Sequence, residues 1–381
     1  MKKVCIVVSS TYTLELFLVA QIRALARLYN VTIVANDSDP KILDRLGLDA
    51  RLITVRIERK IHPIRDVCAL ALLFGVFRRE RFDLVHSVTP KAGFLSMIAA
   101  CFAGTSVRVH TFTGQVWSTK TGTMRWILKF ADKATAFFAT NILVDSHSQC
   151  DFIIREGVLA AKKAAVLANG SISGVNTMRF RPNPEVRARL RASLQIPVDS
   201  FVILYMARLT RDKGALVMAE AFATYGIHNG VSHLIVVGPD EEHLRPQIRK
   251  LCRHYLDRLH FVDLVRVPEE YMACADVFCL PSFREGFGSA LINAAAVGIP
   301  AIATRIYGSS DAVVDGVTGF LFSAGNIDEL VGLLRRLHSD PDLRTSMGLC
   351  ARARATDKFS EELLTSSLLA FYRERIITGK Q

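Results

Sequence analysis

The chain has 381 residues, of which 50% are hydrophobic and 22% are charged, a composition that excludes a disordered or collagen-like protein. The longest apolar run, at residues 67–77, is far shorter than the ~20 residues that a membrane-spanning helix requires. The formal net charge is +12, and residues 1–170 carry 23 Lys and Arg against 13 Asp and Glu. The length predicts two domains, and the basic first half predicts an anionic partner.

Short strings rich in Val and Ile recur along the chain without polar alternation, which predicts strands buried on both faces of parallel sheets. In the first half these strings are residues 4–10, 31–36, 83–88, 107–112 and 141–146. In the second half they are residues 201–207, 233–238, 260–264, 276–281 and 300–304. Segments of helical length lie between them. We therefore expect two doubly wound α/β domains with Rossmann-like topology.

Gly, Ser, Asn and Pro cluster at residues 169–184, between the two series of strings, and predict the domain junction there. We expect domains at residues 1–170 and 171–359, followed by a C-terminal helix and tail at residues 360–381, for which the sequence gives no packing site. Ligands of open α/β sheets bind at the carboxyl ends of the strands. A ligand is therefore expected in a cleft where two such domains face each other.

The eight cysteines form no C-x-x-C pair and mostly sit in apolar strings, which favours a reducing compartment and predicts no metal cluster. The apolar stretch after Lys3 is similar to a secretory signal, but Glu15 interrupts it and no small-residue cleavage site follows. We therefore expect a cytoplasmic protein.

Residues 51–81 are the most basic part of the chain, with eight basic and three acidic residues around the apolar run at 67–77. Two interpretations are open: an interfacial element that binds an anionic membrane, or an ordinary core helix with a solvated basic rim. Zinc-finger spacing and aromatic–basic RNA motifs are absent from the sequence, so no nucleic-acid partner is expected.

The most informative stretch is residues 281–322. A strand ends at Pro281, a tight loop with two glycines follows, and a helix is expected to begin near Ser289. The glycines allow the backbone to approach a ligand, and the helix N-terminus suits a phosphate. Glu285, in this loop, is either a hydrogen-bond acceptor for sugar hydroxyls or an exposed glutamate on a capped loop.

A second stretch, residues 205–222, places Arg208 just after a strand and Lys213 just before Gly214 and a helix. Two cations in a strand-to-helix loop can clamp an anion such as a diphosphate, although solvated loop charges give the same pattern. A third loop, which contains Gly238, is compatible with a nucleotide but is weak on its own.

In this order, the motifs resemble those of the retaining GT-B glycosyltransferases of family four. The residues that carry the resemblance are Arg208, Lys213-Gly214, Gly238, Pro281-Ser282, Glu285-Gly286-Phe287-Gly288, Gly298-Ile299-Pro300 and the segment from Asp315 to Gly319. The first half matches more loosely, chiefly at residues 107–117, and looks like bacterial enzymes that build capsule, O-antigen or related glycans on a lipid carrier.

The resemblance implies a role for each motif. Arg208 and Lys213 would hold the donor diphosphate, and Glu285 would bind hydroxyls of the donor sugar. The remaining donor-side positions would be Gly238, Val262, Gly286, Phe287, Gly288 and Asn293. His110, which we expect to end a strand, would lie near the donor sugar, so that the predicted catalytic residues are His110 and Glu285. Neither a metal nor a cofactor is expected.

The activity implied is transfer of a hexose or N-acetylhexosamine from a nucleotide sugar, expected to be a UDP-sugar, with retention of configuration. The implied acceptor is a lipid-diphosphate-linked sugar or a saccharide. The implied location is the cytoplasm, at the inner face of the plasma membrane. An anionic membrane surface is the expected further partner.

Three positions depart from the family pattern. Asn293 stands where a second glutamate is usual, the loop at residues 9–13 lacks the usual glycines, and Asp263 replaces a glycine. Asn293 leaves open a degenerate relative that only binds nucleotide sugars. A GT-B sugar-nucleotide epimerase, which would share the fold but need no lipid acceptor, is the other alternative. The triplet from Asp37 to Asp39 fits a metal-binding D-x-D motif of another glycosyltransferase fold, but nothing else in the sequence supports that fold.

Overall fold

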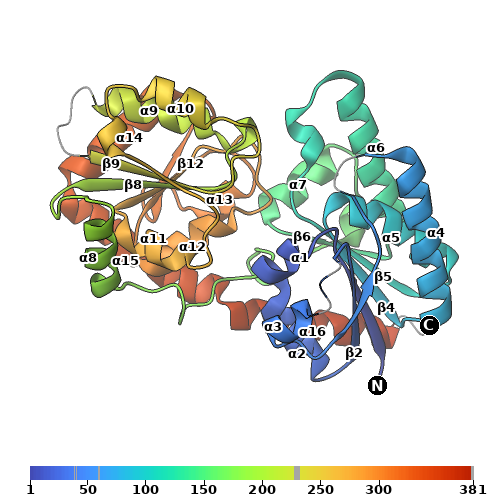
Figure 1. Ribbon diagram of the computed structural model, residues 1–381. Helices are drawn as coiled ribbons and strands as arrows, with labels where there is room; N and C mark the ends of the chain where they lie inside the picture. Colours follow the sequence, from blue (N-terminus) through green and yellow to red (C-terminus); the bar gives the residue numbers. More distant parts are fainter. Residues whose placement is uncertain (38, 40, 59–60, 227–231, 379–381) are drawn as a thin grey trace. The chain divides into compact units, whose positions relative to one another are not determined.

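The computed structural model describes residues 1–37, 39, 41–58, 61–226 and 232–378. Ser38, at the centre of the D-x-D triplet, lies outside these residues. The chain divides into two compact units, one made of Met1–Ser173 with Glu361–Gln381 and the other of Gly174–Ser360. Each unit is a parallel β-sheet with helices on both faces (Figure 1). The expected pair of doubly wound α/β domains is confirmed.

The first unit contains a seven-stranded sheet in the order β3-β2-β1-β4-β5-β6-β7. Its strands are β1 (Lys3–Val7), β2 (Asn30–Ala35), β3 (Arg51–Thr54), β4 (Leu84–Val88), β5 (Val107–Phe112), β6 (Asn141–Val144) and β7 (Ala164–Val166). The strand order reverses between β1 and β4, which pair in parallel with Val4 opposite Leu84. Such a reversal opens a crevice at the carboxyl ends of the two strands.

The helices of this unit begin where the sequence provides start signals. The bounds are α1 (Thr11–Thr13), the π-helical turn η1 (Leu14–Leu18), α2 (Val19–Ala26), α3 (Ile42–Leu46), α4 (Pro63–Glu80), α5 (Pro90–Phe102), the 3-10 turn η2 (Val116–Thr119), α6 (Gly122–Phe138), α7 (His147–Arg155) and the 3-10 turn η3 (Ala161–Lys163). Proline at the first position opens α4 and α5, where the missing N–H costs no hydrogen bond. Ser146 caps α7 by accepting a hydrogen bond from the Gln149 amide at 3.1 Å.

The C-terminal helix α16 (Glu361–Thr378) belongs to the first unit, although the chain reaches it only after the second unit. Leu368, Phe371 and Tyr372 are buried in the same core cluster as residues of β1 and β2, and α16 contacts α2. The Tyr372 hydroxyl lies 2.5 Å from His86 Nδ1. A helix was expected at these residues. The sequence did not predict that this helix packs against the first sheet.

The second unit contains a six-stranded sheet in the order β10-β9-β8-β11-β12-β13. Its strands are β8 (Phe201–Met206), β9 (Ser232–Val237), β10 (Leu259–Val262), β11 (Val277–Leu280), β12 (Ala301–Thr304) and β13 (Gly319–Phe322). The helices are α8 (Pro184–Ser193), α9 (Ala215–Gly226), α10 (Arg245–Leu251), α11 (Pro268–Cys274), α12 (Ser289–Val297), α13 (Ser309–Ala312), α14 (Ile327–Ser339) and α15 (Pro341–Phe359), with the 3-10 turns η4 (Arg211–Lys213) and η5 (Leu256–Arg258). The strand order reverses between β8 and β11.

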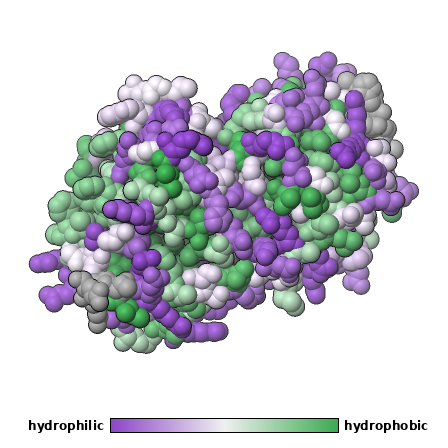
Figure 2. Space-filling model, turned by 180° about the vertical axis from the view of Figure 1, so that it is seen from behind, coloured by the Kyte–Doolittle hydropathy of each residue, from purple (hydrophilic) through white to green (hydrophobic). Residues whose placement is uncertain are grey.

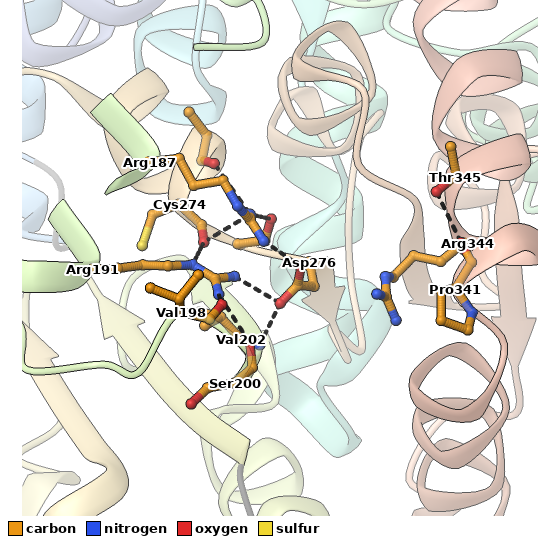
Figure 3. Close-up of polar contacts among 12 residues, drawn as sticks. Arg187, Arg191, Val198, Ser200, Val202, Cys274, Asp276, Pro341, Arg344 and Thr345 are labelled. Carbon is orange, nitrogen blue, oxygen red and sulfur yellow. Dashed lines mark hydrogen bonds and ion pairs between the residues drawn. The ribbon is translucent and has the colours of Figure 1, made fainter. Parts of the chain in front are cut away.

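Two arginines of α8 fasten this helix to the amino ends of β8 and β11 (Figure 3). Asp276 accepts hydrogen bonds from Arg187 Nη2 at 2.6 Å and from Arg191 Nη2 at 2.8 Å, and its Oδ2 also accepts the Val202 amide at 2.7 Å. The guanidinium of Arg191 further donates to the carbonyls of Val198, Ser200 and Cys274. Every charged group of this buried cluster therefore has several partners.

None of the helices that the described residues form combines the length and the apolar character that crossing a bilayer requires.

Candidate active site

The carboxyl ends of β8 and β11 bring together two residues that the sequence separates by 72 positions. Lys213 ends the 3-10 turn after β8, and its Nζ lies 2.6 Å from Oε1 of Glu285 in the loop after β11. The two loops meet at Gly214, where a Cβ atom would lie 1.9 Å from the Pro281 carbonyl oxygen. Gly214 also has a φ of +71°, so glycine is required there for both reasons.

This ion pair is largely buried but incompletely partnered. The side chains of Lys213 and Glu285 are 17% and 10% exposed. Burial lowers the pKa of Lys213, while the neighbouring carboxylate of Glu285 opposes that shift. Within the described residues the Lys213 ammonium donates to Glu285 alone, which leaves two N–H donors and the second carboxylate oxygen available. The pair therefore has the spare hydrogen-bonding capacity that a polar ligand needs.

Tyr205, in β8, holds the loop that carries both predicted phosphate ligands. Its buried hydroxyl lies 3.2 Å from the Lys213 carbonyl oxygen and 3.3 Å from the Arg208 carbonyl oxygen, and donates to them. Burial, together with the Glu285 carboxylate, raises the pKa of Tyr205, so the hydroxyl keeps its proton. The loop is thus fixed by the strand beneath it.

Arg208 is partly exposed and forms an ion pair with Glu241, at 2.7 Å, in the loop after β9. Sequence reasoning identified the arginine but not this carboxylate partner. Gly238 directly follows β9 and has a φ of +142°, and a Cβ atom there would lie 2.1 Å from the Ala207 carbonyl oxygen. The amide of Gly238 donates to the Val262 carbonyl oxygen at 3.0 Å. Gly238 and Val262 therefore lie where the ends of β8, β9 and β10 meet. Donor binding by either residue stays a prediction.

The loop of Gly286, Phe287 and Gly288 leads directly into α12, which begins at Ser289 as expected. Gly288 adopts a φ of +80°, and the Gly286 carbonyl oxygen lies so close to Gly308 that a Cβ atom there would be 2.6 Å away. The Phe287 side chain is 2% exposed and packs edge-on against Phe359. It anchors the loop to the core, so a ligand would meet the backbone of this loop and the amino end of α12.

Asn293 lies on α12, one turn after Ser289, and is partly buried. Among the residues that the structure describes, its side chain has no hydrogen-bond partner. Asp263, the other departure in this unit, is 84% exposed and pairs with Arg245 at 2.7 Å.

His110 lies inside the first sheet. The expectation that it ends its strand is wrong, because β5 continues to Phe112 and the His110 residue is 1% exposed. Its Nδ1 lies 2.9 Å from Ser87 Oγ, and the ring packs so tightly under α5 that a Cβ atom at Gly93 would lie 2.3 Å from Cε1. Burial lowers the pKa of His110 to about 3. The imidazole is therefore neutral and covered, and its catalytic role stays a prediction.

Two features at the carboxyl edge of the first sheet were missed by sequence reasoning. Thr89, between β4 and α5, has a φ of +81°, which is strained for a β-branched residue, and its Oγ1 donates to Ser9 Oγ at 3.0 Å. Asp145, directly after β6, is 4% exposed, and its Oδ1 has no partner among the described residues. Burial raises the pKa of Asp145 to about 8. Neither the backbone angle nor the burial has a local sequence signal.

Comparison with known proteins gives two matches that together span most of the chain. Residues 186–354 match the family of group 1 glycosyl transferases, and residues 14–170 match the glycosyl transferase 4-like domain. The capsular polysaccharide biosynthesis glycosyltransferase CapM of Staphylococcus aureus is 29% identical over 320 residues, which cover 84% of this chain and 83% of CapM. The Escherichia coli UDP-Gal:alpha-D-GlcNAc-diphosphoundecaprenol alpha-1,3-galactosyltransferase is 28% identical over 330 residues, with coverage of 84% and 83%.

Solved structures agree on the architecture. The Anabaena protein HepE, in complex with UDP and glucose, superposes with a TM-score of 0.82 at 18% identity, covering 98% of this chain and 100% of HepE. Sucrose-phosphate synthase from Thermosynechococcus elongatus gives a TM-score of 0.82 at 20% identity, with coverage of 99% and 100%. The chain therefore belongs to the glycosyltransferases, with a glycosyl transferase 4-like domain and a group 1 domain in the GT-B fold.

Proposed function

We propose that this glycosyltransferase moves a hexose or N-acetylhexosamine, with retention, from a UDP-sugar to a lipid-diphosphate-linked sugar during bacterial surface glycan assembly. The observation that carries the proposal is the buried but incompletely partnered Lys213–Glu285 pair beside the amino end of α12. The names of two relatives support it, since one acts in capsule synthesis and the other transfers galactose from UDP-Gal to a diphosphoundecaprenol-linked sugar.

In this proposal the donor diphosphate lies between Arg208, Lys213 and the first amides of α12. Arg208 and Lys213 each have one carboxylate partner, Glu241 and Glu285. The diphosphate would compete with Glu241 for Arg208, because a guanidinium binds phosphate oxygens in a bidentate manner. Glu285 would remain beside Lys213 and accept hydrogen bonds from the sugar hydroxyls through its second oxygen.

The transfer breaks the bond between the anomeric carbon and the phosphate oxygen and forms a bond from that carbon to the acceptor oxygen. The leaving diphosphate gains negative charge, which Arg208, Lys213 and the α12 amino end would stabilise. For retention without a protein nucleophile, the acceptor attacks on the face from which the diphosphate departs, and its hydroxyl proton passes to a phosphate oxygen of the leaving group. His110, which is neutral and buried, would support the loop after β5 and would not exchange protons.

We further propose that the enzyme works in the cytoplasm, at the inner face of the plasma membrane, where a lipid-diphosphate acceptor would be presented. The strained Thr89 and the Oδ1 atom of Asp145, which has no partner among the described residues, lie at the carboxyl edge of the first sheet and make this edge the candidate acceptor side.

The test is to incubate the chain with a panel of UDP-sugars and a synthetic diphosphate-lipid-linked N-acetylglucosamine, and to assign the anomeric configuration of the product by NMR. A product of the same configuration as the donor supports the proposal, and an inverted product overturns the retaining mechanism. A thermal-shift screen identifies the donor first, since a ligand at 100 times its Kd should stabilise the chain by about 2.7 kcal/mol.

A degenerate protein that only binds nucleotide sugars is the second candidate, because Asn293 carries no charge where the family has a glutamate. Asn293→Glu distinguishes the two. A gain of tenfold or more in transfer activity would indicate that the native chain is impaired, whereas little change would show that the family's carboxylate is dispensable here.

A further inference from the structure

Helix α6 (Gly122–Phe138) of the first unit exposes three large aromatic side chains. Trp126 is 69% exposed, Phe130 57% and Phe137 75%. These residues follow one another at spacings of four and seven residues, so they share one face of the helix. The rings of Trp126 and Phe130 stack with centroids 5.8 Å apart. A contiguous aromatic strip therefore faces away from the core.

The inward face of α6 is mixed: Ala136, Leu128 and Phe138 pack in the core, and polar side chains fill the rest of this face. Asp132 is buried and accepts a hydrogen bond from Trp117 Nε1 at 2.8 Å. Lys129 and Arg125 bind Glu156 at 2.6 Å and 3.0 Å. Several polar groups of the helix are thus engaged inside the unit beside the packed apolar residues, while its largest aromatic side chains remain outside.

Helix α4 (Pro63–Glu80) shows a related arrangement. Its inward face buries Ala69, Leu73 and Phe77, yet its outward face is also apolar, with Ile64 74% exposed, Val67 66% and Leu72 57%. The sequence left open whether residues 67–77 form a core helix or an interfacial element. The structure shows a helix with a core face and an exposed apolar face, and hydrophobic side chains gather along the flank of this unit over α4 (Figure 2).

The two helices lie on the same side of the sheet. Both pack against α5, which lies between them (Figure 1), and Phe102 at the end of α5 is itself 68% exposed. We call the exposed surface of these helices the apolar–cationic face. It consists of Ile64, Val67, Leu72, Arg78, Arg81, Phe102, Lys120, Trp126, Phe130, Lys133 and Phe137.

The cations of this face indicate its partner. Arg78, Arg81, Lys120 and Lys133 have no acidic partner within the ranges that the structure describes. Lys133 follows Phe130 by one helical turn, so at least one charge lies within the aromatic strip rather than on a distant surface. A twofold contact between two copies of this face would bring like charges together. Anionic lipid headgroups complement both the charge and the apolar strip.

We propose that the apolar–cationic face of the first unit binds directly to an anionic lipid bilayer, lying in the plane of the interface. The aromatic and aliphatic side chains of α4 and α6 enter the boundary between headgroups and acyl chains, and the four cations contact the headgroups. The inference rests on the proposed function and deepens it. It names the surface by which the enzyme would reach a lipid-linked acceptor. Vesicle binding needs neither donor nor acceptor, so it can fail or succeed independently of sugar transfer.

The first experiment measures co-sedimentation of the chain with vesicles of phosphatidylglycerol and phosphatidylcholine in equal parts. We expect Trp126→Ser/Phe130→Ser to lower the partition coefficient at least tenfold, because it removes the aromatic strip. The matched control is Val198→Ser/Leu349→Ser, at apolar positions of the second unit that are 84% and 65% exposed, which should leave binding unchanged. Raising the salt from about 0.05 M to about 0.5 M should weaken binding of the native chain.

The second experiment uses the two tryptophans of the chain as internal probe and reference. Trp126 is exposed and Trp117 is 1% exposed. Vesicle binding should shift the Trp126 emission to shorter wavelength and make it sensitive to brominated acyl chains, and Trp126→Phe should abolish both effects while binding persists.

Failure of the native chain to bind these vesicles at low salt would overturn the proposal, as would equal binding by the Trp126→Ser/Phe130→Ser variant. A stable dimer that these substitutions dissociate, without any lipid binding, would overturn it in favour of contact between copies. Circular dichroism and thermal unfolding of both double variants establish that each is folded before its binding is compared.

Discussion

The two ends of the β8–β11 strand pair each hold a buried ion-pair cluster, and the clusters differ in how completely their charges are satisfied. At the amino ends, the Asp276 carboxylate accepts from Arg187, Arg191 and the Val202 amide, and Arg191 fills its remaining donors with backbone carbonyls. At the carboxyl ends, the Lys213 ammonium and the Glu285 carboxylate have only each other among the described residues.

The difference indicates what each cluster does. A buried charge is costly unless it is paired and hydrogen-bonded. The amino-end cluster meets that requirement with protein groups alone, which is the mark of a structural network. The carboxyl-end pair keeps unused donors and acceptors beside a helix amino end, which is the arrangement expected where a charged, hydroxyl-bearing ligand completes the partners.

The largest effect on stability should come from the saturated cluster. Asp276→Ala leaves two guanidinium groups, one of them 5% exposed, without their carboxylate, and should lower the free energy of unfolding by ~3–5 kcal/mol. Urea unfolding measures the loss. The control is Asp263→Ala, which removes an 84% exposed carboxylate paired with Arg245 and should cost no more than ~1 kcal/mol. If Asp276→Ala and Asp263→Ala lost the same unfolding free energy, then the number of hydrogen-bond partners would not identify a structural cluster.

The unsaturated pair should give the opposite result, with a large effect on transfer. We expect Glu285→Gln to lower kcat/KM about 100-fold, equivalent to ~2.7 kcal/mol of barrier, because an amide cannot oppose the Lys213 charge or accept sugar hydroxyls equally well. Its unfolding free energy should change less than that of Asp276→Ala. Glu242→Gln, which keeps an oxygen to accept the Arg211 amide, serves as the control in the same assay. An unchanged kcat/KM in Glu285→Gln would remove this glutamate from the site.

The sequence predicted the interior of both sheets but not all of their edges. Each of the ten predicted strings contains a strand, whereas β3, β7 and β13 were missed, and all three are edge strands. Edge strands are short, and β3 and β7 are also less buried, so they lack the continuous run of Val and Ile that identifies a central strand. β13 is buried but begins with Gly319, whose missing side chain lets the backbone approach Ala301.

The positions of Arg208, Lys213 and Glu285 in loops after strands were predictable from the sequence, and their roles toward a donor stay predictions. What depends on tertiary packing was not predictable. The pairing of Arg208 with Glu241, the burial of His110 beneath Gly93 and the strain at Thr89 follow from how distant segments meet. The outward aromatic face of α6 has the same origin, since periodicity identifies two faces but not which one the core takes.

Asp145 in the first unit extends the comparison to a buried carboxylate for which the described part of the chain provides no cationic partner. Its pKa is about 8 in the folded state, far above that of an unfolded chain, so the folded state holds an extra proton between these two values. Stability therefore falls as pH rises through this window. Asp145→Asn removes the dependence, and its unfolding free energy relative to the native chain should rise by ~3–4 kcal/mol between pH 5 and pH 8, since each pH unit contributes about 1.4 kcal/mol in this window. Thermal unfolding across this pH range measures the difference, and a gain that is constant with pH would contradict the assignment.

The smallest effect should come from releasing one cation of the site. Glu241 pairs with Arg208 at a partly exposed position, where such a pair contributes about 0.2–1 kcal/mol. If the donor diphosphate displaces Glu241, then Glu241→Gln should tighten UDP binding by about two- to fivefold, since that pair no longer has to be broken. Calorimetric titration with UDP measures the gain, and Arg208→Gln should weaken binding in the same titration. Weaker binding by Glu241→Gln would show that the carboxylate orients Arg208 for the ligand. The Arg208–Glu241 pair would then be a structural element, like the Asp276 cluster.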